Sequence, residues 1–306
     1  MANATAVIIA AGLAIVACKD KSVPGDDLPP RLIPYMEYLS TSTVDDYVYF
    51  FFGGDTVFAG GIYRYDVVSG GQPELVVARA FAAAVSPCGD QLAYISYFGE
   101  LCLIGLDTLN PDQPDFTLLA PVGPVGGATS VRWRGCDRVL FDYAACEQDS
   151  CYGVYEIAVP SLESKLLIRS GGTAASDARG AAIVYVSDAF TLNLQHDGQI
   201  DTLLHFHPND RPISFPLLSQ AGDKIAYHRV WVDTAEHRMR YDGEVFEIAT
   251  GEIRHVADGA TFLTWTRDRR ILYSGLDSVK FREIWMTDEN GTGHEQVLEY
   301  DDFYER

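Results

Sequence analysis

The chain is poor in positive charge. It has 23 lysines and arginines against 43 aspartates and glutamates, which gives a formal net charge of −20 and an isoelectric point near 4.6. The phosphates of nucleic acids require a basic protein surface, so this balance excludes DNA and RNA as partners. A strong net charge keeps a protein soluble and separate from its copies, and we expect a monomer.

The sequence also lacks an apolar run long enough to span a bilayer. Residues 6–17 are apolar, which is too short for a membrane span but suits the core of a signal peptide. The run ends in Ile15-Val16-Ala17-Cys18, which resembles the lipobox of bacterial lipoproteins. In that family the cysteine is acylated and becomes the new N-terminus. The alternative is a stray apolar N-terminus with a buried cysteine.

The lipobox resemblance implies an address for the protein. We expect a signal peptide over residues 1–17, then a lipidated Cys18 and a flexible tether over residues 18–34, which contain four prolines. The protein would be exported and anchored on the periplasmic or extracellular face of a membrane, through its lipid alone.

Enzyme motifs are missing from the sequence. There is no G-x-S-x-G nucleophile elbow, no H-E-x-x-H zinc motif, no G-x-G-x-x-G after a strand and no phosphate loop. Paired acids such as Asp45-Asp46 and Asp301-Asp302 are interpreted as solvated loop charges, because the whole chain is acidic. We therefore predict no catalytic residue.

Short alternating apolar stretches are what the sequence has in abundance. Helical periodicity is nearly absent after residue 20, which argues against α/β folds. A period of 40 to 50 residues is typical of a β-propeller blade. Six of the apolar stretches end in an aromatic residue, 42 to 47 residues apart: Tyr49, Tyr94, Phe141, Tyr185, Tyr227 and Tyr273.

The second repeat shows the unit most clearly. Strands are expected over residues 83–85, 91–96, 101–107 and 116–119. Four short strands joined by hairpins make a propeller blade, whose apolar faces are buried only when blades stack. Six units fill residues 35–306, so we predict an all-β fold, a six-bladed β-propeller of four-stranded antiparallel blades. A β-sandwich with coincidental spacing is the alternative.

The turn of this repeat carries a family resemblance. Residues 86–94, Ser-Pro-Cys-Gly-Asp-Gln-Leu-Ala-Tyr, resemble the S-P-D-G-x-x-I-A-Y repeat of TolB-type, WD40-like propellers. Residues 263–265 and 287–291 of the sixth unit look like the same family. The resemblance covers all six units and is sharpest in the second, fifth and sixth. Its motif is a structural turn, so it implies no catalytic residues for this chain.

The cysteines fit export rather than metal binding. None has the close C-x2-C spacing of a zinc site. Cys146 and Cys151 lie between two strands of the third unit, where a hairpin could join their sulfurs, and we predict a disulfide there. Cys88 and Cys136 occupy nearly equivalent turns of adjacent units, and the sequence leaves open whether they pair. Cys102, in mid-strand, is expected to be a buried small hydrophobic residue.

Three residues are weak metal candidates. His205-Phe206-His207 alternates like a strand, so both imidazoles would point to one side, with Asp210 just beyond them. They could hold one divalent metal of the zinc class, and Asp and Asn oxygens in the channel could hold calcium, as in gluconolactonase-like propellers. A plain connecting loop is the simpler interpretation, and we expect no cofactor.

One connection is unusually long. From the second-strand aromatic to the middle of the third strand, the fifth unit needs 19 residues, whereas the others need 7 to 14. The flanking strands are expected over residues 224–227 and 244–248. The bland interpretation is an extended hairpin whose arginines pair with nearby acids. Arg and aromatic residues are enriched among interface anchors. The candidates for partner binding are Arg229, Trp231, His237, Arg238, Arg240 and Tyr241.

Together these features predict a non-catalytic cell-envelope lipoprotein whose propeller binds a protein or glycan partner. The alternative is a propeller enzyme of the lactonase or lyase type, with a metal-assisted site at the central channel. Propellers carry both kinds of function, so the fold alone does not separate the two.

Overall fold

The computed structural model describes residues 36–53, 60–107, 116–120, 128–143, 153–169, 172–207, 210–233, 238–277 and 280–303. All of them belong to one compact unit, residues 32–306. Within these ranges the chain forms six antiparallel sheets of four strands each. No helix in them is long and apolar enough to cross a membrane. Residues 1–35, with the predicted signal peptide, Cys18 and tether, lie outside the description.

Each sheet is one blade and uses four strands that follow one another in the chain. The first three blades are β1 Met36–Thr41, β2 Tyr47–Phe52, β3 Gly61–Asp66 and β4 Glu74–Ala78; β5 Ala80–Val85, β6 Gln91–Ser96, β7 Leu101–Gly105 and β8 Thr117–Ala120; β9 Ala128–Arg134, β10 Arg138–Tyr143, β11 Gly153–Ala158 and β12 Ser164–Arg169. The last three are β13 Gly172–Ser176, β14 Ala182–Val186, β15 Thr191–His196 and β16 Gln199–His205; β17 Ile213–Leu218, β18 Lys224–Asp233, β19 Arg238–Glu247 and β20 Ile253–Asp258; β21 Ala260–Trp265, β22 Ile271–Asp277, β23 Lys280–Thr287 and β24 Glu295–Glu299, followed by a 3-10 turn, Tyr300–Phe303.

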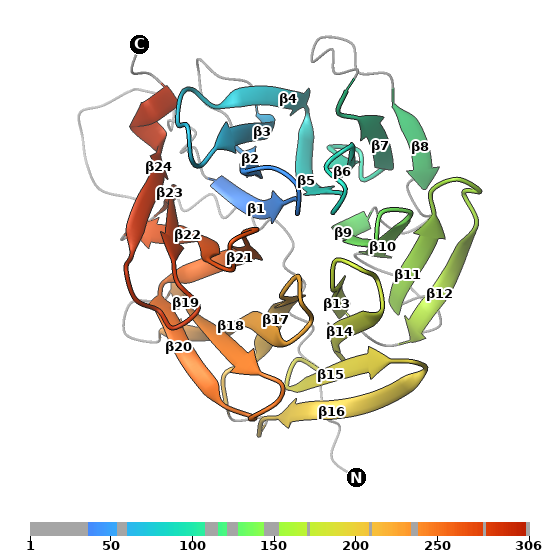
Figure 1. Cartoon of the computed structure of the whole chain (residues 1–306), viewed down its shortest axis with the longest axis vertical. Helices are drawn as coiled ribbons and strands as arrows, with labels where there is room; N and C mark the ends of the chain where they lie inside the picture. The colour runs from blue at the N-terminus through green and yellow to red at the C-terminus, as the bar shows by residue number, and fades with distance from the viewer. Residues whose placement is uncertain are drawn as a thin grey trace, which may run out of the picture. The chain divides into compact units, whose positions relative to one another are not determined.

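The blades surround a central channel with their first strands innermost, as Figure 1 shows. The six-bladed propeller predicted from the repeat is therefore confirmed, and the β-sandwich alternative is wrong. We call the side that carries the turns after each innermost strand the inner-turn face. The opposite side, which carries the connections between second and third strands, is the hairpin face.

The aromatic repeat holds with one shift in position. Tyr94, Phe141, Tyr185, Tyr227 and Tyr273 are buried in second strands, where each packs toward the preceding blade. In blade one the equivalent residue is Phe50 rather than Tyr49. Phe50 packs with blade six, whereas Tyr49 faces blade two. Tyr49 was the wrong choice because successive side chains of a strand point to opposite faces.

The Ser-x-x-Gly-Asp sequence forms the same inner turn wherever it occurs. In blade two, Ser86 Oγ donates to the Asp90 carboxylate over 2.8 Å, and Gly89 takes a φ of 74°. In blade five, Ser219 Oγ donates to Asp223 over 2.7 Å. The serine and aspartate close the turn, and glycine adopts the left-handed conformation without strain. The motif is structural, as predicted.

Neighbouring blades are tied together at the inner-turn face. The indole N–H of Trp133 donates to the carbonyl of Ala84 in the preceding blade over 2.7 Å. Trp265 donates in the same way to Leu217 over 3.1 Å. Cys88 and Cys136 form a disulfide between the inner turns of blades two and three, with their Cα atoms 5.7 Å apart. The bridge that the sequence left open is thus present.

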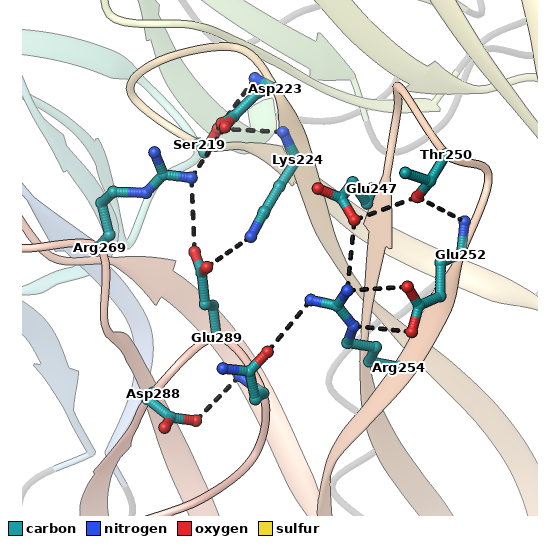
Figure 2. A network of polar contacts seen from close by, with 11 residues as sticks. Ser219, Asp223, Lys224, Glu247, Thr250, Glu252, Arg254, Arg269, Asp288 and Glu289 are labelled. Carbon is teal, nitrogen blue, oxygen red and sulfur yellow. Dashed lines mark hydrogen bonds and ion pairs between the residues drawn. The ribbon is translucent and has the colours of Figure 1, made fainter.

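Blades five and six are joined by ion pairs on the same face (Figure 2). Lys224, which is buried, pairs with Glu289 over 2.5 Å. Arg269 lies 2.8 Å from Asp223 and 3.4 Å from Glu289, so it bridges the two blades. A buried lysine is tolerated only when it is paired. This network therefore has a structural role.

The ring closes through side-chain contacts, chiefly apolar packing, with a hydrogen bond from Thr41 to the Trp265 carbonyl and an ion pair of Arg267 with Asp46 beside it. Blade one and blade six each consist of four consecutive strands, so no strand is shared between the ends of the propeller. Instead, Met36, Phe50 and Phe52 pack with Ile284 and other buried residues of blade six. Phe303, at the end of the 3-10 turn, stacks on Phe52 with ring centroids 4.3 Å apart.

Phe303→Ala should destabilise the propeller. The side chain is buried and contacts Phe50, Phe52 and Tyr63, so its removal leaves a cavity in the closing cluster. A buried Phe→Ala change costs about 3–5 kcal/mol of unfolding free energy, which thermal and urea unfolding would detect. Phe98→Ala is the control, because Phe98 is 75% exposed and should leave the stability unchanged. Equal stabilities would show that the ring does not depend on this cluster.

Candidate functional site

The long connection of blade five is a strand hairpin. β18 and β19 pair over ten residues each, from Lys224 opposite Glu247 to Asp233 opposite Arg238. The predicted short strands, residues 224–227 and 244–248, were wrong in extent. The insertion alternates β-branched and aromatic residues with arginines, and such residues continue a strand rather than end it. The hairpin extends toward the hairpin face.

One side of this hairpin carries arginines stacked on aromatic rings. The guanidinium of Arg229 lies 3.7 Å from the ring centroid of Phe206, at the end of blade four. Arg211, in the connection that enters blade five, lies 3.6 Å from the ring centroid of Trp231. Both distances are within the range of a cation–π interaction. The connection into the blade and the long hairpin therefore meet on the hairpin face.

The same side holds one carboxylate and a third arginine. Asp242 stands opposite Arg229 in the ladder and forms an ion pair with Arg211. Burial raises the pKa of Asp242, although Arg211 opposes this shift. Arg240 stands opposite Trp231 and is half-buried. We call this set the hairpin patch: Phe206, Arg211, Arg229, Trp231, Arg240 and Asp242.

The predicted partner-binding residues do not all gather in this patch. Tyr241 lies on the other side of the hairpin, where its ring contacts His228 with centroids 6.3 Å apart. His237 and the side chain of Arg238 lie outside the described residues. Arg229, Trp231 and Arg240 are brought together, and Phe206 and Arg211 join them from the connection between blades four and five, which the sequence analysis considered only for metal binding.

The metal candidates have other roles in the structure. β16 ends at His205, whose Nδ1 lies 2.8 Å from the Thr191 hydroxyl. Asp210 accepts a hydrogen bond from the backbone N–H of His207 over 2.8 Å and so shapes a turn. Over the described ranges, no three His, Cys, Asp or Glu side chains are grouped to hold a metal ion. Cys102 is buried and free, as predicted, whereas Cys146 and Cys151 lie outside the description.

The central channel holds a residue that the sequence argument missed. At one level of the channel the six innermost strands present equivalent residues: Ser40, Ala84, Arg132, Ala175, Leu217 and Thr264. Five of them are neutral, and the sixth is an arginine in the centre of the propeller. Aligning the repeats by their inner turns would have revealed this outlier. A cation at this level is a poor neighbour for a divalent metal.

An aromatic collar lies on the hairpin-face side of Arg132. Each residue of the collar lies within a β-bulge of an innermost strand. The aromatic rings of neighbouring blades contact one another. The ring centroids of Tyr38 and Phe262 are 4.7 Å apart, and those of Phe215 and Phe262 are 5.8 Å apart. We define the collar as Tyr38, Phe81, Phe215 and Phe262.

The backbone of the collar is strained. Tyr38, Phe215 and Phe262 have φ values of 56°, 49° and 49°, in the left-handed region that bulky residues rarely adopt. Each such residue costs on the order of 1–3 kcal/mol, and residues of this kind cluster at functional sites. The repeated bulge turns aromatic side chains toward the channel that an unbroken strand would direct elsewhere.

Two titratable groups sit beside the collar. His228 is fully buried, and burial, helped by the charge of Arg132, lowers its pKa to about 3. Its Nε2 accepts a hydrogen bond from the Leu263 N–H over 3.3 Å, so the proton is on Nδ1, which has no hydrogen-bond partner. Burial raises the pKa of Glu37 to about 7, and burial, followed by the charge of Glu37, raises the pKa of Tyr241.

Solved structures of known proteins share the fold of this chain. No family model and no curated protein matches this sequence. Among solved structures, TolB from Acinetobacter baumannii matches with a TM-score of 0.60 at 15% identity, over 88% of this chain and 65% of the TolB chain. This chain thus spans less than two thirds of the length of that TolB.

Two enzymes share the fold as well. An oligogalacturonate lyase in complex with manganese matches with a TM-score of 0.55 at 11% identity, over 86% of this chain and 77% of its own. An acylaminoacyl peptidase from Pyrococcus horikoshii matches with a TM-score of 0.53 at 13% identity, over 88% and 53%. At these identities the likeness shows the fold that TolB, lyases and peptidases share, and nothing of their activities.

Glu37 should make stability depend on pH. Its folded pKa of about 7 lies above the ordinary value of 4.5, so its contribution is complete below about pH 4.5 and is lost as pH rises through about 7. Glu37→Gln stays neutral, so it should match the wild type at pH 4 and be more stable at pH 8, on the order of 1–3 kcal/mol. Thermal unfolding across this pH range measures the difference. Exposed Glu163→Gln should show no such trend, and a Glu37→Gln effect that does not change with pH would contradict the prediction.

Proposed function

We propose that the protein is a non-catalytic, membrane-anchored binding protein of the cell envelope, and that its hairpin patch binds an acidic region of a partner protein. The observation that carries this proposal is the pair of arginine–aromatic stacks, Arg211 on Trp231 and Arg229 on Phe206, beside Arg240. No role in closing the blade requires them, because the other five blades are complete without such an extension.

The charge of the patch favours an acidic partner. The patch brings together the guanidinium groups of Arg211, Arg240 and the buried Arg229, and Asp242 pairs with Arg211, in a chain whose net charge is −20. Stacking on an aromatic ring orients a guanidinium while leaving its edge N–H groups able to donate to carboxylates. Arg and Trp are also the residue types that most often carry the binding energy of protein interfaces.

The state of Trp231 favours a protein over a glycan. Arg211 already covers one face of the indole at 3.6 Å, so that face is not open for stacking against a sugar ring. The side chain is half-buried rather than projecting. The carboxylates of an acidic protein segment would bind the N–H groups at the edges of the guanidinium groups. The aromatic stacks hold these N–H groups in position.

Anchoring through Cys18 would place this surface at a membrane. The support is the lipobox-like run Ile15-Val16-Ala17-Cys18 and the proline-containing segment that follows it. The disulfide between Cys88 and Cys136 is in keeping with an oxidising compartment, since such bridges are rare in the cytosol.

Substitutions in the hairpin patch should weaken the partner complex selectively. We expect Trp231→Ala and Arg240→Gln each to cost about 1–2 kcal/mol of binding free energy, a loss of roughly 5- to 30-fold in affinity, because both remove interface anchors. The partner would be captured from the native envelope and its affinity measured with purified components. Arg267→Gln is the matched control, because it removes the same charge on the inner-turn face. Equal losses for Arg240→Gln and Arg267→Gln would contradict the hairpin patch, and a captured ligand that survives protease digestion would identify a glycan instead.

Cys18→Ser should release the protein from the membrane. Each acyl CH₂ buried in the bilayer contributes about 0.8 kcal/mol, so the loss of the acylated residue removes the anchor. Fractionation should find the variant in the soluble fraction or retained as an unprocessed precursor. Cys102→Ala changes a cysteine inside the propeller and should stay in the membrane fraction. A Cys18→Ser protein that is processed and still pellets with membranes after a high-salt wash would contradict lipid anchoring.

A further inference from the structure

We propose that the central channel is a binding site for a small organic carboxylate, which enters from the inner-turn face and pairs with the guanidinium of Arg132. This inference is independent of the hairpin patch, which lies on the opposite face and outside the channel.

The site is a cavity of about 100 Å³ to which all six blades contribute. Its outer part is lined by residues at or just after the ends of innermost strands, among them Thr43, Pro87, Ala178 and Gln220. A water molecule takes a share of about 30 Å³ in the liquid, so the cavity has room for roughly three waters or for a carboxylate on a short stem. The pocket is too small for a drug-sized ligand.

Arg132 provides the charge that defines the ligand. It lines this cavity and a smaller one next to it, which also contacts Thr173 and Phe215. Its guanidinium donates to the carbonyl of Val131 over 2.8 Å. Five N–H donors are available on a guanidinium, so most of its hydrogen-bonding capacity is left for another acceptor.

No carboxylate of the described chain forms an ion pair with Arg132. Asp142 attracts it electrostatically from beyond ion-pair distance, and burial lowers the pKa of the guanidinium. The next arginines of the same blade differ in this respect, since Arg134 and Arg138 both pair with Glu156. Arg132 thus lines the cavity, only partly exposed, with no ion-pair partner among the described residues. A buried charge is costly unless it is paired, so an anion that enters the cavity gains a strong interaction.

The surroundings strengthen that interaction. The aromatic collar lines the channel on the hairpin-face side of Arg132. An apolar environment has a low dielectric constant, which strengthens the attraction between opposite charges. His228 is neutral at physiological pH, so it does not compete for the anion. Ser40 and Thr264 provide hydroxyl groups at the wall of the cavity that can complete the hydrogen bonds of a carboxylate.

A carboxylate fits better than a phosphate or sulfate. The planar fork of a guanidinium matches the two oxygens of a carboxylate, and such bidentate pairs are strong. A single arginine balances one negative charge, whereas a dianion would stay partly unpaired in an acidic protein. The apolar part of the wall, which includes Ala84, Ala175 and Leu217, suits a short aliphatic stem.

The test is calorimetric titration of the purified full chain with acetate, propionate and butyrate in chloride-free buffer. We expect saturable one-to-one binding of at least one of them, and none of propionamide, which has the same shape without the charge. Arg132→Gln should weaken binding at least tenfold, and Arg267→Gln, on the same face but outside the cavity, should change it less than twofold.

A second variant keeps the test sharp if Arg132→Gln folds poorly. Ala175→Leu retains the arginine and fills part of the cavity, so it should weaken butyrate more than acetate. Circular dichroism and the melting temperature verify the fold of each variant. The proposal is overturned if none of the three acids binds the wild type, if Arg132→Gln binds as the wild type does, or if sulfate or phosphate binds more tightly than every carboxylate.

Discussion

The propeller depends on apolar packing between its two ends. Over the described residues no strand passes between blade one and blade six, so side chains form the seam: Met36, Phe50 and Phe52 are buried against blade six, and Thr41 and Arg267 add polar contacts. A single blade leaves two apolar faces in water, and only a closed ring buries both. The stacking of Phe303 on Phe52 extends this seam beyond the last strand. The channel and the position of every blade follow from that closure.

The two faces of the propeller are built differently. On the inner-turn face, neighbouring blades are tied by the indole bonds of Trp133 and Trp265, by the disulfide of Cys88 with Cys136, and by the ion pairs of Figure 2. A cavity on this face is therefore framed by rigid elements. On the hairpin face, the connections between second and third strands differ in length from blade to blade, and the hairpin of β18 and β19 extends furthest, with ten residues in each strand. Variation there leaves the core intact because the paired strands satisfy their own backbone hydrogen bonds.

Positive charge is scarce in this chain, and two of the places where it occurs differ in their surroundings. The hairpin patch holds Arg211 and Arg240 at the surface beside the buried Arg229, and Asp242 pairs with Arg211. Arg132 is instead a single charge enclosed by the blades, close to a collar whose left-handed backbone at Tyr38, Phe215 and Phe262 costs folding free energy. The first arrangement suits an extended acidic surface, and the second suits one small anion. The low dielectric around the channel also keeps His228 neutral and Glu37 protonated up to about pH 7.

The architecture could be read from the sequence because it is written in local, repeated chemistry. The aromatic period, the alternating strands and the Ser-x-x-Gly-Asp turns each act within one blade, and the length of the insertion after Tyr227 was visible by comparison with the other units. The one-residue error at Tyr49 shows the limit of such reading, since only packing against a neighbouring blade distinguishes it from Phe50. The hairpin patch and the channel site were harder to predict from the sequence. Which arginines of the hairpin share a side, and that Arg211 joins them, depends on strand register and on a segment from outside the insertion. Aligning the repeats would single out Arg132 as the one charged residue at its position, but only the convergence of six strands, spread over more than 200 residues, places it at the wall of a cavity.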